Sequence, residues 1–161
     1  RLPLADGRFD LVVCAEMLEH VRADSRVLAE IARVLRPGGE LAVSVPRHGP
    51  ERLCWALSAD YAAAEGGHVR IYCKPALLAR LRRAGLKPRA SHYAHSLHTP
   101  FWWLKCLFWQ SQDTNWLVRQ YHRLLVWDLM KNPALTRILE KSMNPIMGKS
   151  VVMYFRKEAS A

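Results

Sequence analysis

The stretch FDLVVCAEMLEHVRADSRVLAEIARVLRPGGELAVSVP, residues 9–46, decides the fold. It opens with Phe9–Ala15, a short Val-rich apolar run that only Asp10 interrupts. Such a run is typical of a strand buried on both faces. Charge then appears abruptly at Glu16–His20, directly after the predicted strand. The polar side chains therefore gather at the carboxyl end of this strand.

A helix and a second strand complete the same stretch. Asp24 or Ser25 can cap the helix, and apolar residues recur from Val27 to Leu35 at the spacing of one helical face. Residues 36–39, Arg-Pro-Gly-Gly, end it, because Pro cannot continue a helix and Gly tolerates a left-handed turn. Leu41–Val45 is then a second buried strand. Strand, helix, turn and strand together predict a βαβ crossover with two parallel strands.

Length and charge bound the possible functions. A chain of 161 residues with 50% hydrophobic and 24% charged residues is long enough for one domain with its own core. The 24 Lys and Arg residues outnumber the 14 Asp and Glu residues, giving a net charge of +10. This excess favours anionic partners such as nucleic acid, phospholipid or phosphorylated substrates. A solvated basic surface explains it equally well.

The cysteines and the apolar runs indicate a compartment. Cys14, Cys54, Cys73 and Cys106 form no C-x-x-C pair and no disulfide framework, which favours a reducing cytoplasmic location. The sequence contains no signal peptide and no apolar run of bilayer-spanning length. It begins without Met, directly before what reads as a central strand, so we expect it to be the downstream part of a longer chain. Phe9–Ala15 would then be an exposed apolar edge.

The remaining elements follow from periodicity and from Pro and Gly positions. We expect a helix over Pro50–Glu65, a short strand over His68–Tyr72, a helix from Pro75, a strand over Lys87–Tyr93, helices over Phe101–Gln110 and Asn115–Met130, a third helix after Asn132-Pro133, and a last strand over Ser150–Arg156. In the third of these late helices, Leu135, Ile138 and Leu139 are expected to point inward.

Two clusters in the second half carry possible chemistry. His92, His95 and His98 are spaced three apart, but odd intervals on a strand point to opposite faces and no carboxylate or Cys accompanies them. We therefore predict no metal site. Residues 101–131 hold five of the six tryptophans, interleaved with Lys and Arg. This composition suits an aromatic cap over a pocket or a membrane interface, and equally plain packing on the sheet.

The motifs LPLADGRFDLVVCAEMLEHV and EIARVLRPGGELAVSVP resemble the second half of a class I S-adenosylmethionine-dependent methyltransferase, closest to the type-11 group that includes ubiquinone and menaquinone methyltransferases. The resemblance implies an α/β fold: a partial doubly wound, Rossmann-like sheet of strands 4 to 7, in a family order 3-2-1-4-5-7-6 with the last strand antiparallel. It also implies one partial domain over residues 1–161, with a helical aromatic cap at residues 101–144 inserted before the last strand.

The resemblance also assigns candidate site residues. Ala15, Glu16 and Met17 would line the S-adenosylmethionine pocket, with Glu16 accepting a hydrogen bond from the cofactor's amino group. His20 would face the substrate, and His20 or His48 would serve as a general base. Trp102 and Trp103 would contact the substrate. The alternatives are a helix-start carboxylate for Glu16 and a structural hydrogen bond for His20.

The function that the resemblance implies is methyl transfer to a small-molecule or lipid-like acceptor. We expect this activity of the longer parent chain, because the family's Gly-rich cofactor loop and its ribose-binding acidic residue have no candidates here. Both would lie upstream of Arg1. The alternative is a non-catalytic methyltransferase-like module whose basic aromatic cap binds a membrane surface or a protein partner. Ala15–Leu18 occupies the place of an Asn-Pro-Pro-Tyr-like element, which argues against nucleic-acid methylation.

Overall fold

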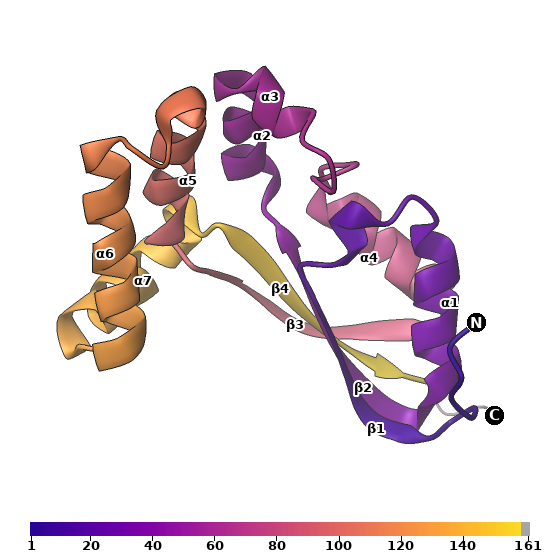
Figure 1. The fold of residues 1–161 in the computed structure, drawn as a ribbon. Coiled ribbons are helices and arrows are strands. Elements are labelled where there is room, and N and C mark those ends of the chain that lie inside the picture. The colour runs from indigo at the N-terminus through magenta and orange to yellow at the C-terminus, as the bar shows by residue number, and fades with distance from the viewer. Residues whose placement is uncertain (159–161) are drawn as a thin grey trace. The chain divides into compact units, whose positions relative to one another are not determined.

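The computed structural model describes residues 1–158 (Figure 1). The elements, in chain order, are β1 Phe9–Ala15, the 3-10 helix η1 Leu18–His20, α1 Asp24–Val34, β2 Leu35–Pro46, α2 His48–Leu57, α3 Ala59–Ala62, α4 Lys74–Arg83, β3 Leu86–Ala94, α5 His98–Leu107, the 3-10 helix η2 Trp109–Ser111, α6 Trp116–Lys131, α7 Ala134–Met147 and β4 Ser150–Lys157. No helix within these residues is both long enough and apolar enough to cross a bilayer.

The chain forms two compact units, which we describe separately. The sheet unit comprises residues 1–46, 69–92 and 151 onward; it holds β1, α1, α4 and nearly all of the sheet. The helical unit comprises residues 47–68 and 93–150; it holds α2, α3, α5, α6 and α7.

A four-stranded mixed sheet organises the first unit. The strand order is β1-β2-β4-β3, and β4 runs opposite to the other strands (Figure 1). β1 and β2 are parallel, with Val12 opposite Leu41 and Ala15 opposite Ser44. The predicted βαβ unit of residues 9–46 is therefore confirmed, because α1 connects these two neighbouring parallel strands.

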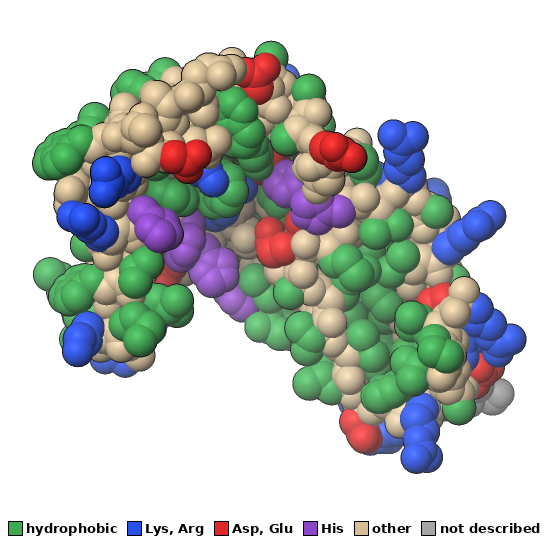
Figure 2. Space-filling model, in the orientation of Figure 1, with side chains coloured by type: hydrophobic (Ala, Val, Ile, Leu, Met, Phe, Trp, Pro, Cys, Tyr) green, Lys and Arg blue, Asp and Glu red, His purple; other side chains and the backbone are tan. Residues whose placement is uncertain are grey.

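One face of the sheet is packed and the other is largely open. Leu41, Val43 and Val45 of β2 are buried together with alternate residues of β4, and α1 and α4 contribute Ile31 and Leu81 to this core. β1 departs from the prediction that it is buried on both faces. Leu11 and Val13 are 56% and 65% exposed, because β1 is the edge strand and no described element covers their face. Figure 2 shows hydrophobic side chains gathered on this side of the unit.

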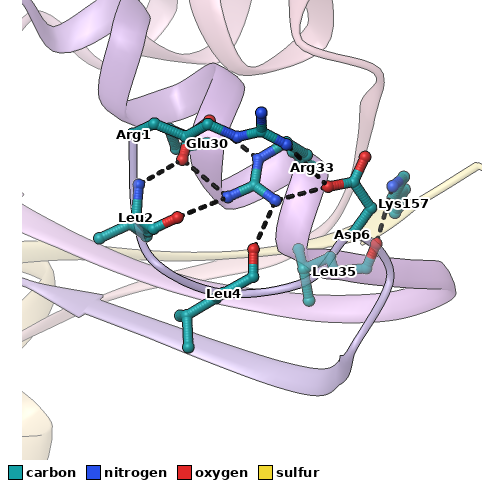
Figure 3. A network of polar contacts seen from close by, with 8 residues as sticks. All are labelled: Arg1, Leu2, Leu4, Asp6, Glu30, Arg33, Leu35 and Lys157. Atoms are coloured by element: carbon teal, nitrogen blue, oxygen red, sulfur yellow. Dashed lines mark hydrogen bonds and ion pairs between the residues drawn. The ribbon is translucent and has the colours of Figure 1, made fainter.

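The N-terminal segment is fastened to α1 by one arginine (Figure 3). Arg33 donates to both carboxylate oxygens of Glu30, at 2.9 and 2.8 Å, and to Asp6 Oδ1 at 2.6 Å. It also donates to the carbonyl oxygen of Leu4, at 2.7 Å. The amide of Leu2 donates to Glu30 at 2.7 Å. These bonds give the residues before β1 a defined path, because Arg33 presents several donors in a rigid fork.

In the helical unit, capping residues and proline set where α6 and α7 begin and where α6 ends. Asn115 accepts from the amides of Leu117 and Val118 and so begins α6, as its residue type predicts. Asn132 ends α6 in the left-handed conformation, at φ 44°. The sequence placed Asn132 at the start of the next helix instead. Pro133 takes the position before α7, and that helix continues through Pro145 to Met147.

Three other expectations about helices and strands are wrong. Residues 68–72 form no strand. The helix expected over Pro50–Glu65 is divided into α2 and α3, because the side chain of Ser58 caps a new turn by accepting from the amide of Tyr61 at 3.0 Å. Leu135, Ile138 and Leu139 are 75%, 67% and 46% exposed rather than inward, because the described elements cover a different face of α7.

Candidate functional site

A tight turn follows β1 at the carboxyl end of the two parallel strands. Its backbone is held by a hydrogen bond of 3.0 Å from the amide of Glu16 to the carbonyl oxygen of Ser44 on β2. Glu16 has φ 46°, a left-handed conformation that a non-glycine residue adopts rarely and that often marks functional turns. Ala15, Glu16 and Met17 are all exposed. A carboxylate on this turn can accept hydrogen bonds from a ligand beyond the strand ends.

His20 ends the next turn, η1, beside a buried carboxylate. Glu19 is 1% exposed, and its Oε1 lies 3.9 Å from Nε2 of His20. The Glu19 carbonyl oxygen accepts from the amide of Val69 at 2.8 Å. The sequence gives no sign of this burial, because Glu19 stands among other polar residues directly after the strand.

Burial and charge also act on the thiol beneath this turn. Cys14 is 4% exposed, and burial together with the negative charge of Glu19 raises its pKa to about 11. The thiol is therefore neutral at ordinary pH and serves as a small apolar side chain.

A second carboxylate in the sheet unit has a structural task. Asp24 is 3% exposed and accepts from the hydroxyl of Tyr72 at 2.5 Å and from Arg80 at 2.8 and 2.9 Å, and it pairs with Arg70. Burial opposes its ionisation, but the hydrogen bonds from Tyr72 and Arg70 outweigh burial and hold the pKa of Asp24 below its usual range. The sequence predicted that Asp24 or Ser25 caps the helix, whereas Ala23 takes that position and Asp24 fixes residues 70–72 against α1.

The remaining predicted site residues belong to the helical unit. His48 is the first residue of α2 and is half-buried. Trp102 and Trp103 lie on α5, where Nε1 of Trp103 donates to the carbonyl oxygen of Pro50 at 3.2 Å. The Trp102 ring lies 5.9 Å from the Tyr61 ring, with Lys105 Nζ 4.9 Å from its centroid. Both tryptophans thus connect α5 to the α2–α3 region, which is a packing role of the kind that the sequence also allows.

A buried polar cluster lies in the same unit and was not predicted. Glu51 of α2 is fully buried and accepts from Tyr61 at 2.8 Å and from Lys149 at 2.6 Å. His68 Nδ1 lies 2.6 Å from its Oε1. Burial alone would raise the pKa of Glu51, but the His68 hydrogen bond and the Lys149 charge outweigh it and lower that pKa to about 2. No spacing in the sequence links these residues, which come from four separate segments.

The structure thus divides the predicted site residues between its units. Ala15, Glu16, Met17 and His20 share one strand end in the sheet unit, whereas His48 and the two tryptophans belong to the helical unit.

Comparison with known proteins identifies relatives for part of the chain. A family profile described as "Methyltransferase domain" matches residues 1–43. A ubiquinone biosynthesis O-methyltransferase of Dechloromonas aromatica is 38% identical over 88 residues, covering 51% of this chain and 38% of that protein. One from Xanthomonas euvesicatoria is 40% identical over 87 residues, covering 50% and 36%. The aligned part is thus well under half of these relatives' length.

Solved structures share the fold over nearly the whole chain. A methyltransferase-like protein from Bacillus halodurans has a TM-score of 0.56 at 18% identity, covering 99% of this chain and 68% of its own. A structure from Thermotoga maritima, described as an S-adenosylmethionine-dependent methyltransferase, has a TM-score of 0.58 at 17% identity, covering 98% and 60%. The chain therefore shares the α/β fold of these proteins, and its residues 1–43 match the methyltransferase domain profile.

Proposed function

We propose that the protein containing this chain transfers a methyl group from S-adenosylmethionine to a small lipophilic acceptor. The observation that carries the proposal is the exposed turn Ala15–Met17 at the carboxyl end of β1, the place where open parallel sheets bind ligands. The relatives named as ubiquinone biosynthesis O-methyltransferases support a hydroxyl group on a lipophilic molecule as the acceptor.

The sheet supports a specific assignment of strands. Its order β1-β2-β4-β3, with β4 reversed, has the pattern expected for strands 4-5-7-6 of a doubly wound methyltransferase sheet. β1 would then be the fourth strand of the family's sheet. The exposed side chains of Leu11 and Val13 lie on this edge strand. The same assignment makes residues 1–161 a single partial methyltransferase domain, with residues 101–144 as a helical cap inserted before the last strand.

The residues present fit the cofactor's charged end. Glu16 offers an exposed carboxylate on a turn whose backbone is already fixed by the bond to Ser44, so an ammonium group can be held without reordering the chain. Ala15 and Met17 flank it and would line the pocket. When bound, S-adenosylmethionine supplies an activated methyl group on a sulfonium.

His20 is the residue we assign to proton removal from the acceptor hydroxyl. Its side chain is 40% exposed and lies beside the buried carboxylate of Glu19. An imidazole at this strand end can take the proton of an acceptor hydroxyl that lies within hydrogen-bond reach. His48 is the second candidate base, and Trp102 and Trp103 of the cap would contact the lipophilic acceptor.

The cofactor assignment is tested in the intact protein by calorimetric titration with S-adenosylmethionine. Glu16→Gln should weaken binding about tenfold, which corresponds to one lost charge-assisted hydrogen bond. Glu40→Gln is the matched control, because Glu40 is an exposed carboxylate on β2. Equal affinities for the Glu16→Gln variant and the unchanged protein would remove the assigned role, and absence of any binding in the unchanged protein would overturn the proposed activity.

A second candidate, a module that binds a membrane surface, rests on the exposed side of α6 and α7. Large apolar residues are strongly exposed there: Trp116 at 67%, Leu129 at 81%, Met130 at 74%, Leu135 at 75%, Ile138 at 67% and Ile146 at 72%. Exposed Lys and Arg residues accompany them (Figure 2). Apolar side chains mixed with basic ones suit the headgroup region of an anionic bilayer.

Vesicle sedimentation tests this candidate. The protein should bind phosphatidylserine-containing vesicles, and the double substitution Leu129→Gln and Met130→Gln should reduce binding, whereas Leu53→Gln on α2 should not. Binding without any affinity for S-adenosylmethionine would favour a non-catalytic module. Binding together with cofactor affinity would describe a peripheral enzyme, and no binding would remove the membrane contact.

A further inference from the structure

We propose that His95, His98 and Glu140 form a binding site for a divalent transition-metal ion in the helical unit. Each residue offers one ligand atom, and the three atoms all lie within 4.8 Å of one another. The three residues belong to the helical unit, whereas the strand end assigned to the cofactor belongs to the sheet unit, and the proposal does not depend on methyl transfer.

The backbone after β3 brings the two histidines together. His95 adopts φ 63°, a left-handed conformation that turns the chain sharply as the strand ends. The amide of His98 donates back to the carbonyl oxygen of His95 at 3.1 Å. As a result the two imidazole rings lie 5.4 Å apart between centroids, at an interplanar angle of 78°. On a continuing strand these side chains would have diverged.

Helix α7 supplies the carboxylate and is fastened to the same turn. The Ser96 hydroxyl donates to the carbonyl oxygen of Glu140 at 3.2 Å, and the Ser96 amide donates to Oδ1 of Asn144, one turn further along α7, at 3.0 Å. Ser96 is 1% exposed. The two segments that carry the ligands are thus held together by two hydrogen bonds of the buried Ser96, and such a supporting contact helps to fix the ligands of a metal site.

Two observations point to a ligand that these side chains would share. Nδ1 of His98 is buried and has no hydrogen-bond partner among residues 1–158. A buried polar atom in that condition costs free energy that a ligand would recover. In addition, Nδ1 of His95 and Oε1 of Glu140 are 3.9 Å apart, wider than a hydrogen bond.

The donor set selects the kind of ion. Two imidazoles and one carboxylate form a common Zn²⁺ set that leaves a position for water, whereas Mg²⁺ prefers oxygen ligands throughout. In a tetrahedral zinc site the donor atoms lie about 3.4 Å apart, so the three side chains would move inward by about 1 Å. Asp128 adds a further negative charge near His98, while the nearby Lys149 is paired with Glu51.

The proposal departs from the sequence prediction for a structural reason. That prediction found no metal site because no carboxylate accompanies the three histidines in sequence, but folding brings Glu140 from 45 residues beyond His95. His92 is not part of this cluster. Its ring stacks on Tyr154 in the sheet unit, with the two ring centroids 5.7 Å apart.

Metal titration of the intact protein tests the site, with Zn²⁺ measured against a chromophoric chelator and Co²⁺ followed by visible absorption. We expect one Zn²⁺ per chain, a Co²⁺ spectrum of low coordination number, and no competition from millimolar Mg²⁺. His98→Gln and Glu140→Gln should each weaken Zn²⁺ binding at least about tenfold, as loss of a ligand does. His92→Gln is the matched control and should bind as the unchanged protein does.

Circular dichroism of each variant separates a lost ligand from a lost fold. If His98→Gln unfolds, Glu140→Gln and the Co²⁺ spectrum carry the test, because Glu140 has 28% of its side chain exposed and its carboxylate can be replaced by an amide of the same shape. Absence of stoichiometric Zn²⁺ binding would overturn the proposal. So would Zn²⁺ affinity that is the same in Glu140→Gln as in His92→Gln.

Discussion

Glu51 and Lys149 lie far apart in the sequence and form a buried ion pair, with 2.6 Å between Oε2 and Nζ. Glu51 is fully buried and Lys149 is 8% exposed. The pair connects the first turn of α2 to the residue that precedes β4, so it holds two distant segments of the helical unit together. Each charge offsets the cost of burying the other, because either one alone would be buried without its main counter-charge.

Removing the cation should therefore be costly. Lys149→Met leaves Glu51 with Tyr61 and His68 as partners, and we expect a loss of about 3 kcal/mol in the free energy of unfolding. Urea denaturation followed by circular dichroism measures this loss. Lys141→Met is the matched control, because Lys141 is exposed on α7, and it should change stability by less than about 0.5 kcal/mol. Similar losses in both variants would contradict the role assigned to the pair.

The same carboxylate should make the protein sensitive to acid. Its pKa is about 2 in the folded protein, against an ordinary 4.5. Because the folded-state pKa is the lower one, the unfolded chain takes up the proton first. The stabilisation is complete above about pH 4.5 and is lost progressively as the pH falls to about 2, by on the order of 3 kcal/mol. Asp24, whose pKa is also lowered, acts in the same direction.

Stability curves measured between pH 6 and pH 2 would show this loss. Glu51→Gln should reduce the slope over the acid range, and the slope that remains should belong to Asp24 and other carboxylates. Glu65→Gln, at an exposed position, should keep the full slope. An unchanged slope in Glu51→Gln would show that this carboxyl has the same pKa in both states.

The hydroxyl of Tyr72 gives a third prediction, in the sheet unit. Tyr72→Phe removes the 2.5 Å hydrogen bond to Asp24 but keeps the ring, which is 5% exposed. Since Asp24 keeps Arg70 and Arg80, we expect a moderate loss of about 1–2 kcal/mol in the free energy of unfolding. Tyr154→Phe is the control, because that side chain is 39% exposed. Equal stability of the two variants would reject the Asp24 network as a stabilising feature.

The sequence predicted the elements whose signals are local. Phe9–Ala15 is a strand with the predicted bounds, α4 begins within one residue of Pro75, and α6 begins directly after Asn115. The turn predicted at residues 36–39 is wrong, because these residues belong to β2, which begins at Leu35 directly after α1. The turn at Glu16 was also predictable in place, because charge follows an apolar run directly. Its left-handed backbone was not, since Glu shows no preference for that conformation.

Long-range pairing accounts for what the sequence could not predict. Asp24 resembles a helix cap locally, and only the approach of Arg70 and Tyr72 explains its burial. Likewise, α7 has an apolar stripe of the usual spacing, but the contacts of α7 rather than its periodicity decide which residues are covered. The cluster around Glu51 joins residues that share no motif, so no pattern in the sequence announces it.

His20 gives the last prediction, which separates a catalytic base from a structural histidine. In the intact protein, His20→Ala should lower kcat by about 10²–10⁴ while the affinity for S-adenosylmethionine stays unchanged, because a base acts on the acceptor and not on the cofactor. The reason to prefer His20 over His48 is its place four residues after Glu16, at the end of β1 in the sheet unit, whereas His48 belongs to the helical unit. His48→Ala should therefore have a smaller effect on kcat, and His92→Ala none. Steady-state kinetics with a lipophilic hydroxyl acceptor, together with calorimetry for the cofactor, measure both quantities. A His20→Ala variant that loses cofactor affinity, or keeps its full kcat, would reassign this residue to the framework of the turn after β1.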